Sequence, residues 1–210
     1  MLEMKKYSVT GLILAGGKGS RMGGLDKGLE HFNGTPLALH ALNRLKAQED
    51  TAISSFMLIA NRNTADYEAM GVPVRHDAIE GFAGPLAGIL TGLQHCQTEL
   101  LLTVPCDCPN FPLNLAHKLL AAMTDETIEI AMATSNDSDG QIRTQPVFCL
   151  MRKGLADNLA QYIQAGGRKI ETWVKLQHYA LVNFESHDNL SSAFANVNTL
   201  EELKLLAKLS

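Results

Sequence analysis

The stretch VTGLILAGGKGSRMGGLDK, residues 9–27, decides the fold. Its first part, Val9 to Leu14, is apolar on both faces, as is typical of a parallel strand buried in a sheet. The strand leads directly into a glycine-rich loop that ends at Lys27. Five glycines in this loop permit positive φ angles and let backbone N–H groups approach phosphate oxygens without a Cβ between them. The stretch therefore predicts a phosphate-binding loop at the end of a buried strand.

The loop also carries cations. Arg21 and Lys27 supply the charge that a triphosphate needs, and Lys18 is a third candidate. Two common phosphate motifs do not match, because Gly17-Lys18 is followed by Gly, and Gly17-Lys-Gly19 is followed by Ser-Arg-Met. A flexible surface loop is the alternative, although such a loop need not leave a buried strand or combine glycine with cations.

Apolar segments of strand length alternate with segments of helical period along the rest of the chain. Strands are expected at 9–14, 56–60, 72–75, 99–104, 128–134, 146–150 and 179–182, and helices at 36–47, 85–94, 113–123, 155–163 and 199–209. This alternation predicts a three-layer α/β fold, with a mostly parallel sheet and helices on both faces. We find no repeat, low-complexity tract or linker, so we expect residues 1–210 to form one domain.

Sheets of this kind bind ligands beyond the carboxyl ends of their strands, which would gather the loops at 15–27, 61–63, 77–84 and 105–109. Asp107, in the sequence PCDCP, would place a carboxylate there, where it could ligate Mg²⁺ between phosphate oxygens. A turn or helix-capping aspartate is the alternative. Asp77 ends another strand, and its role is open between a second metal ligand, a ribose contact and an acid beside a second substrate.

Composition excludes some partners and predicts a compartment. The net charge of -4 and the pI near 6.0 argue against a basic nucleic-acid surface or a polybasic membrane patch. The four cysteines form no CxxC pair and are expected to be reduced. No run approaches the roughly 18 apolar residues of a membrane span, and the N-terminus reads as a strand entering a loop. We therefore expect a cytoplasmic protein without nucleic-acid or membrane partners.

Six motifs together carry a resemblance. They are LAGGKGSRMGGLDK at 14–27, ANR at 60–62, HD at 76–77, GPLAGI at 84–89, PCDCP at 105–109 and NVNT at 196–199. In this order they resemble the molybdenum cofactor guanylyltransferase family, which implies a Rossmann-like fold of the nucleotide-diphospho-sugar transferase type. The ending MGGLDK is specific to that family, whereas LAGGxGxRM is shared with sugar-nucleotide pyrophosphorylases and cytidylyltransferases.

The resemblance implies a reaction and its participants. GMP would be transferred from GTP to the terminal phosphate of molybdopterin, with release of pyrophosphate and formation of the guanine dinucleotide cofactor. Mg²⁺ is the implied metal, with Asp107 as its ligand, and proteins that insert or receive the cofactor are candidate partners. The catalytic candidates are Arg21, Lys27 and Asp107. The GTP-binding candidates are Leu14, Ala15, Gly16, Gly17, Lys27, Asn61, Asp77 and Asp107.

The binding site for the pterin, molybdopterin, called the pterin side below, rests on fewer observations. Its candidates are Gly84, Pro85, Gln145, Asn196 and Asn198. Gly84 and Pro85 open a helix whose N–H groups could face an anion, and simple packing is the alternative. Thr199 and Glu202 have the spacing of a helix capping box. A capping role accounts for Thr199 but not for both asparagines, Asn196 and Asn198, which are therefore assigned to the pterin. Ile59 stands where some family members have asparagine, so the resemblance leaves two alternatives: the polar nucleotide contact is missing, or Asn61 supplies it.

Two other functions remain open from the sequence. A cytidylyltransferase or sugar-nucleotide pyrophosphorylase would share the fold, because guanine could be read by backbone carbonyls near Leu14 and Ala15, which leave no residue-type signature. A non-catalytic nucleotide-sensing module is the alternative from another class. The joint presence of Arg21, Lys27 and Asp107 argues against it, since a sensor has no use for a metal at the α-phosphate.

Overall fold

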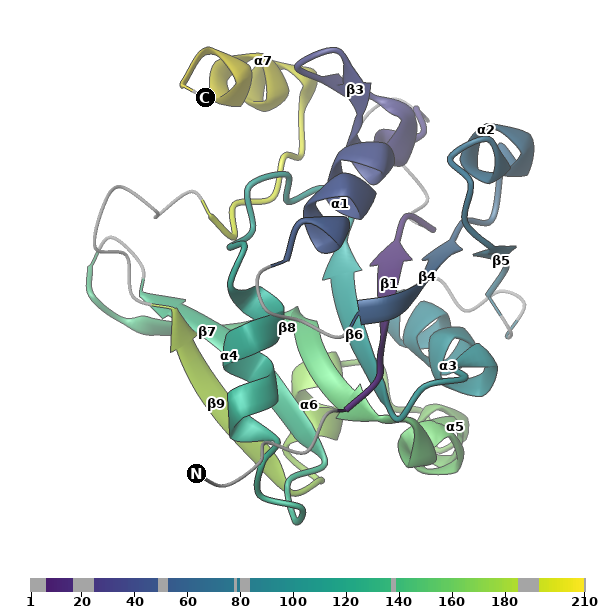
Figure 1. Cartoon of the computed structure of the whole chain (residues 1–210), viewed down its shortest axis with the longest axis vertical. Helices are drawn as coiled ribbons and strands as arrows, with labels where there is room; N and C mark the ends of the chain where they lie inside the picture. The colour runs from purple at the N-terminus through teal and green to yellow at the C-terminus, as the bar shows by residue number, and fades with distance from the viewer. Residues whose placement is uncertain are drawn as a thin grey trace.

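The computed structural model describes residues 7–16, 25–48, 53–77, 79, 84–136, 139–184 and 193–209, and its centre is a seven-stranded sheet (Figure 1). The strand order is β5-β4-β1-β6-β8-β7-β9. The strands are β1 (Val9–Leu14), β4 (Ile53–Ile59), β5 (Val74–Arg75), β6 (Leu100–Pro105), β7 (Ile130–Asn136), β8 (Ile142–Arg152) and β9 (Tyr179–Phe184). The helices of eight or more residues are α1 (Leu37–Lys46), α3 (Pro85–His95), α4 (Leu115–Ala122), α5 (Ala156–Gln164) and α7 (Leu200–Leu209).

The sheet is mostly parallel, as predicted. Strand β1 pairs in parallel with β4 on one side and β6 on the other, and β4 pairs in parallel with β5. Strand β8 is the exception, because it runs antiparallel to both of its neighbours, β6 and β7. The first five residues of β1 are buried, which is the environment expected of a strand that is apolar on both faces.

Helices cover both faces of the sheet, which confirms the three-layer prediction. The buried residues of α1 and α4 pack with one face, and those of α3, α5 and the short helix α6 (Ile170–Val174) pack with the other. Trp173 is fully buried in the second of these cores, where its Nε1–H donates to Asn158 Oδ1 at 2.8 Å. Hydrophobic burial on both faces thus holds the strands at fixed positions.

Several short elements escaped sequence prediction. A hairpin of β2 (His31–Phe32) and β3 (Thr35–Pro36) precedes α1, and its turn residues Asn33 and Gly34 have φ angles of 49° and 80°. These positive φ angles belong to a type I′ turn, for which Asn-Gly is the strongest local signal. Two five-residue helices, α2 (Thr64–Glu68) and α6, were also missed, because one helical turn carries little periodicity.

The ends of the central strands are in register. Leu14 pairs with both Ile59 of β4 and Pro105 of β6, so the following loops begin at one level of the sheet. In Figure 1 these strand ends point toward the part of the molecule that carries β3 and α7. The sheet therefore gathers the loops after β1, β4 and β6 along one edge, as the parallel arrangement predicts.

Helix α7 returns the end of the chain to the same edge. Val197 and Leu203 form a small core with Phe32 and Leu37, next to the hairpin. Thr199 Oγ1 accepts a hydrogen bond from the Glu202 N–H at 3.1 Å, so half of the predicted capping box is confirmed. The Glu202 carboxylate instead accepts from the N–H of Asn198 at 2.6 Å, one residue earlier than a capping box requires.

Two further expectations concern cysteines and membranes. Cys96, Cys106, Cys108 and Cys149 are free and buried, as expected for reduced thiols. No helix in the described ranges is both long enough and apolar enough to span a bilayer.

Candidate active site

A cavity of about 520 Å³ lies beyond the carboxyl ends of β1, β4 and β6. Ten of the residues predicted for the site line it: Leu14, Ala15, Gly16, Lys27, Asp77, Gly84, Pro85, Asp107, Gln145 and Asn196. Asn61 and Asn198 lie one hydrogen bond behind this lining. Gly17 and Arg21 fall outside the described residues. The structure thus brings together the described candidates from all six motifs, and Gln145 from outside them.

Lys27 and Asp107 form the polar centre of the cavity. The Lys27 ammonium lies 2.6 Å from Asp107 Oδ2, although the two residues are 80 positions apart in the chain. Lys27 begins a 3-10 turn, Lys27–Leu29, and Asp107 follows β6 by two residues. Both side chains keep about a fifth of their surface exposed, at 21% and 20%. An ion pair this accessible adds little to stability, so its partners can exchange for ligand atoms.

The end of the chain supports this pair from behind. Asn198 Oδ1 accepts a hydrogen bond from Lys27 Nζ at 3.2 Å, and the Val197 N–H donates to the Asp107 carbonyl at 2.8 Å. The Cys108 thiol donates to Asn196 Oδ1 at 2.6 Å. The two asparagines predicted for the pterin side therefore lie beside the cation and the carboxylate.

The thiols that flank Asp107 are not available as nucleophiles. Burial raises the pKa of the Cys106 thiol, and the same cause raises the pKa of the Cys108 thiol. The charge of Asp107 acts in the same direction on both. Because only a thiolate attacks efficiently, chemistry at this site does not pass through either cysteine.

Asn61 and Asp77 form a second polar group on the other wall. Asn61 Nδ2 donates to Asp77 Oδ2 at 2.7 Å and to the Gly16 carbonyl at 3.3 Å, while the Asp77 N–H donates to Asn61 Oδ1 at 2.9 Å. Burial raises the pKa of the Asp77 carboxyl, and the hydrogen bond from Asn61 partly opposes that rise. Ile59 also lines the cavity, as an apolar residue. The polar group at this wall is therefore Asn61, two residues further along.

The opposite wall comes from β8 and was only partly predicted. Gln145 lines it together with Pro146, Val147 and Phe148, which sequence reasoning assigned to a strand but not to the site. The Gln145 amide donates to Ser135 Oγ at 3.0 Å. Phe148 is almost fully buried and packs edge-on against Phe194 from the end of the chain. This wall offers an apolar surface with one amide, and only its tertiary position could reveal it.

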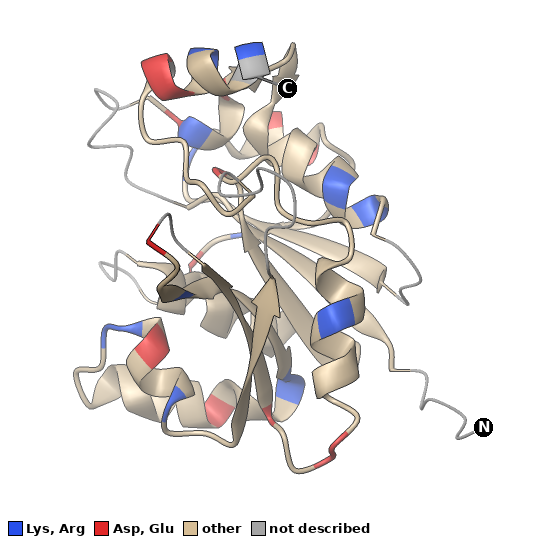
Figure 2. Cartoon of the chain, turned by 90° about the vertical axis from the view of Figure 1, so that its left-hand side faces the viewer, with Lys and Arg blue, Asp and Glu red and all other residues tan. Residues whose placement is uncertain are grey.

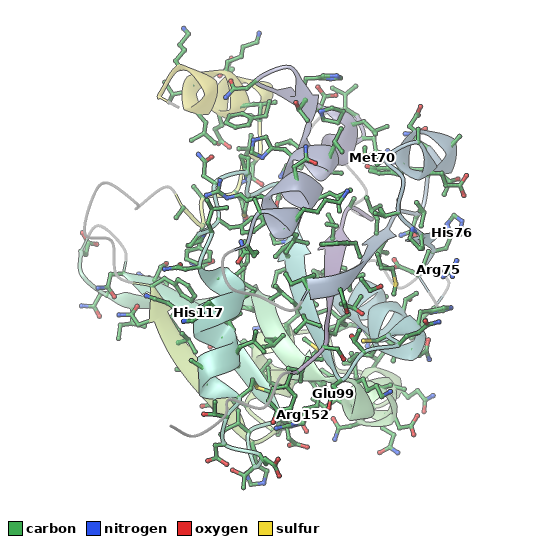
Figure 3. All side chains as sticks on the ribbon, in the orientation of Figure 1. Met70, Arg75, His76, Glu99, His117 and Arg152 are labelled. Carbon is green, nitrogen blue, oxygen red and sulfur yellow. The ribbon has the colours of Figure 1, made fainter. Side chains whose placement is uncertain are left out.

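Charged side chains of the described residues are spread over the molecule away from the cavity. Figure 2 shows acidic and basic residues interspersed over the helices and loops around the strands. His76 and Arg75 lie at the outer edge of the sheet, and His117 lies on α4 at the other side of the molecule (Figure 3). In the described part of the chain, no three or more His, Cys, Asp or Glu side chains gather as a metal cluster would require.

These features define a class of protein. A mostly parallel sheet, a glycine-rich segment that leaves its central strand, and a lysine–carboxylate pair at a cavity beyond the strand ends characterise an α/β enzyme that acts on nucleotides.

The comparisons with known proteins give the family. A family model described as the MobA-like NTP transferase domain matches residues 11–181. The chain belongs to this family, and it is a nucleotidyltransferase.

Individual relatives agree with that assignment. The chain is 51% identical over 205 residues, covering 95% of both chains, to a protein of Acidovorax ebreus named molybdenum cofactor guanylyltransferase. It resembles the structure of molybdopterin-guanine dinucleotide biosynthesis protein A from Archaeoglobus fulgidus with a TM-score of 0.70 at 18% identity, covering 95% and 97% of the two chains. A 4-diphosphocytidyl-2C-methyl-D-erythritol synthase from Anaerococcus prevotii shares the fold with a TM-score of 0.72 at 13% identity, covering 98% and 99%.

The Asn61–Asp77 contact makes a prediction about the carboxyl. Replacing Asn61 by alanine removes the hydrogen bond that lowers the pKa of Asp77, so this pKa should move further above its ordinary value. The measurement is an NMR titration of the Asp77 side-chain carboxyl carbon. Asn158→Ala is the matched control, because the Asn158 side chain contacts Trp173 and not Asp77. An unchanged Asp77 pKa in the Asn61 variant would contradict the described geometry.

Proposed function

We propose that this chain transfers GMP from GTP to the terminal phosphate of molybdopterin, releasing pyrophosphate and forming the guanine dinucleotide cofactor. The observation that carries the proposal is the Lys27–Asp107 pair at the cavity, in a chain half identical to a molybdenum cofactor guanylyltransferase over nearly its whole length. The buried, free cysteines support a reducing compartment, and we place the reaction in the cytoplasm.

GTP would lie between two polar groups of the cavity. The wall of Leu14, Ala15 and Gly16 offers backbone groups to the guanine, and the neighbouring Asn61–Asp77 pair offers an amide and a carboxylate to the nucleoside. Lys27 then faces the phosphates. Arg21, assigned from the sequence, would join it in offsetting the charge that builds on the leaving pyrophosphate.

The acceptor would enter along the β8 wall. Gln145 and Asn196 line the cavity there, and the start of α3 at Gly84 and Pro85 lines it as well. Asn198 contacts Lys27 and so stands where the two substrates' phosphates would meet. The terminal phosphate of the acceptor attacks the α-phosphorus of GTP in line. No covalent enzyme intermediate is needed, because positioning and charge stabilisation suffice for phosphoryl transfer.

The residues present fit a divalent cation, which we propose to be Mg²⁺. Magnesium is usually held by one or two carboxylates together with substrate phosphate oxygens and water, so a dedicated protein cluster is not required. Asp107 presents one partly exposed carboxylate to the cavity, and its ion-pair partner Lys27 can turn to a phosphate instead. When bound, the cation supplies positive charge to the triphosphate. The chain's own contribution is to fix the backbone of Asp107 just after β6, where the Val197 N–H donates to the Asp107 backbone carbonyl.

Pyrophosphate release tests the proposed reaction. The chain is incubated with molybdopterin and, in separate samples, GTP, CTP, ATP or UTP, and pyrophosphate is measured with and without Mg²⁺. We expect Mg²⁺-dependent release with GTP, and tighter binding of GTP than of the other nucleotides in a parallel titration. Tighter binding of CTP would contradict guanine specificity. Binding of GTP without pyrophosphate release would favour a nucleotide sensor.

Asp107→Ala tests the role of the central carboxylate. The substitution removes the proposed metal ligand and leaves the Lys27 ammonium without its nearest acceptor, so kcat/KM should fall by about 10²- to 10³-fold, as when a key charge-stabilising group is lost. Asp125→Ala is the matched control, because Asp125 is exposed and hydrogen-bonds only within its own turn. Turnover near that of the unchanged chain in the Asp107 variant would refute the assignment.

A further inference from the structure

The residue before Lys27 is a buried carboxylate that the proposed reaction does not use. The Asp26 side chain is 6% exposed. It accepts hydrogen bonds from Tyr67 Oη at 2.6 Å and Asn63 Nδ2 at 3.0 Å, and Arg62 Nε lies 3.5 Å from it. A buried carboxylate is costly unless it is fully paired, and apolar packing often stabilises a fold equally well. Stability alone therefore gives little reason for an aspartate at this position.

Among the described residues, the three side chains that contact the Asp26 carboxylate come from one segment, residues 61–67, which follows β4. Asn63 has a left-handed backbone with φ of 50°, and Tyr67 is fully buried. Burial and the hydrogen bond to Asp26 raise the pKa of the Tyr67 hydroxyl, so it remains a donor. The segment thus presents donors from three side chains to a single carboxylate.

The same segment also fixes the chain on both sides of Lys27. Arg62 donates to the Leu25 carbonyl at 2.7 Å, before Asp26. After Lys27, Gly28 packs directly on the Tyr67 ring, where an added Cβ would overlap the hydroxyl. The backbone of Lys27 is therefore held within one residue in each direction. A side chain with four rotatable bonds gains a defined reach only if its backbone is fixed in this way.

The start of the glycine-rich stretch is tied to this segment as well. Asn61 donates to the Gly16 carbonyl at 3.3 Å and to Asp77 at 2.7 Å. Residues 61–67 therefore contact Gly16 on one side of the stretch and Leu25 and Asp26 on the other. Residues 61–67 therefore connect the cavity wall that we propose for the nucleoside to Lys27, which we propose binds the phosphates.

We propose that Asp26 is a positioning residue for the reaction, which fixes Lys27 toward the phosphates by anchoring it to residues 61–67. This inference rests on the proposed function of Lys27. Asp26 touches no substrate, so its effect on turnover passes through the placement of Lys27. Misplacement of a charged group by about 1 Å can reduce a rate by about a hundredfold.

Asp26→Asn tests this role with little change in volume. The three side chains that contact the carboxylate, Asn63, Tyr67 and Arg62, all present donors to it, so the new amide NH₂ would face donors and release the anchor. We expect kcat/KM for GTP to fall by about ten- to a hundredfold and GTP affinity to fall with it. Tyr67→Phe removes one donor and should cost about two- to tenfold. The double variant should be no worse than Asp26→Asn alone, because both changes disrupt the same anchor.

Asn158→Ala is the control for a purely structural effect. Asn158 lies on α5 and accepts the hydrogen bond of the buried Trp173 N–H on α6, so its replacement should lower Tm without changing kcat/KM below the transition. Wild-type kcat/KM and GTP affinity in the Asp26 variant would overturn the proposal. The proposal would also be overturned if the losses of kcat/KM caused by Asp26→Asn and Tyr67→Phe multiplied in the double variant. A third contrary result would be that Asn158→Ala, at an equal loss of Tm, lowers kcat/KM as much as Asp26→Asn does.

Failure of the proposed reaction can be distinguished from failure of the proposed role of Asp26. Absence of pyrophosphate release from the unchanged chain would contradict the reaction, but the Asp26 role would still be decided by affinity. In that case wild type and variant are compared with whichever nucleotide binds most tightly in the titration series. Equal affinities would overturn the positioning role.

Discussion

The parallel pairing of β1 with strands on both sides is the constraint on which the rest of the molecule depends. Because Leu14 is in register with Ile59 and Pro105, the segments that follow three strands must start at the same level. Ala15 and Asp107 line one cavity for this reason, and Asn61 lies one hydrogen bond behind it, although no two of these residues are near in sequence. The helices on the two faces secure this register through two separate cores.

The central ion pair illustrates the difference between stability and function. Lys27 and Asp107 are each only about a fifth exposed, so the cost of removing their charges from water offsets much of their attraction in the free energy of folding. Holding them 2.6 Å apart nevertheless draws contributions from residue 26 at one end of the chain and residues 197 and 198 at the other. Such extensive support is expected of groups whose geometry matters more than their binding energy to each other.

Much of the fold could be predicted from local pattern. The apolar runs of β1 and β6 and the period of α1, α3 and α5 are strong signals, and the rule for parallel sheets then places the loops. The hairpin at residues 31–36 was missed although Asn33-Gly34 marks its turn. The antiparallel direction of β8 was missed for a different reason, since strand direction depends on tertiary packing and not on the strand's own residues.

For the candidate site, the sequence likewise allowed the residues that follow strands to be predicted, but not the long-range contacts between them. Lys27 and Asp107 were identified because each follows a strand, β1 or β6, whose apolar sequence shows that it is buried, and Asp77 because it follows the short strand β5. The contact between Asn198 and Lys27 spans 171 positions, and the burial of Asp26 against Tyr67 spans 41. No periodicity or spacing encodes such contacts, because they arise only when α7 and residues 61–67 pack beside the sheet edge.

In the proposed function, Lys27 and Asp107 mark the phosphate side of a nucleotide cavity. A crystal structure of the chain with GTP, Mg²⁺ and no acceptor would show whether they do. We expect phosphate oxygens within hydrogen-bond distance of Lys27 Nζ and the guanine against Leu14 to Gly16. The proposal would be contradicted by a nucleotide bound elsewhere, or by an intact Lys27–Asp107 pair with no phosphate beside it.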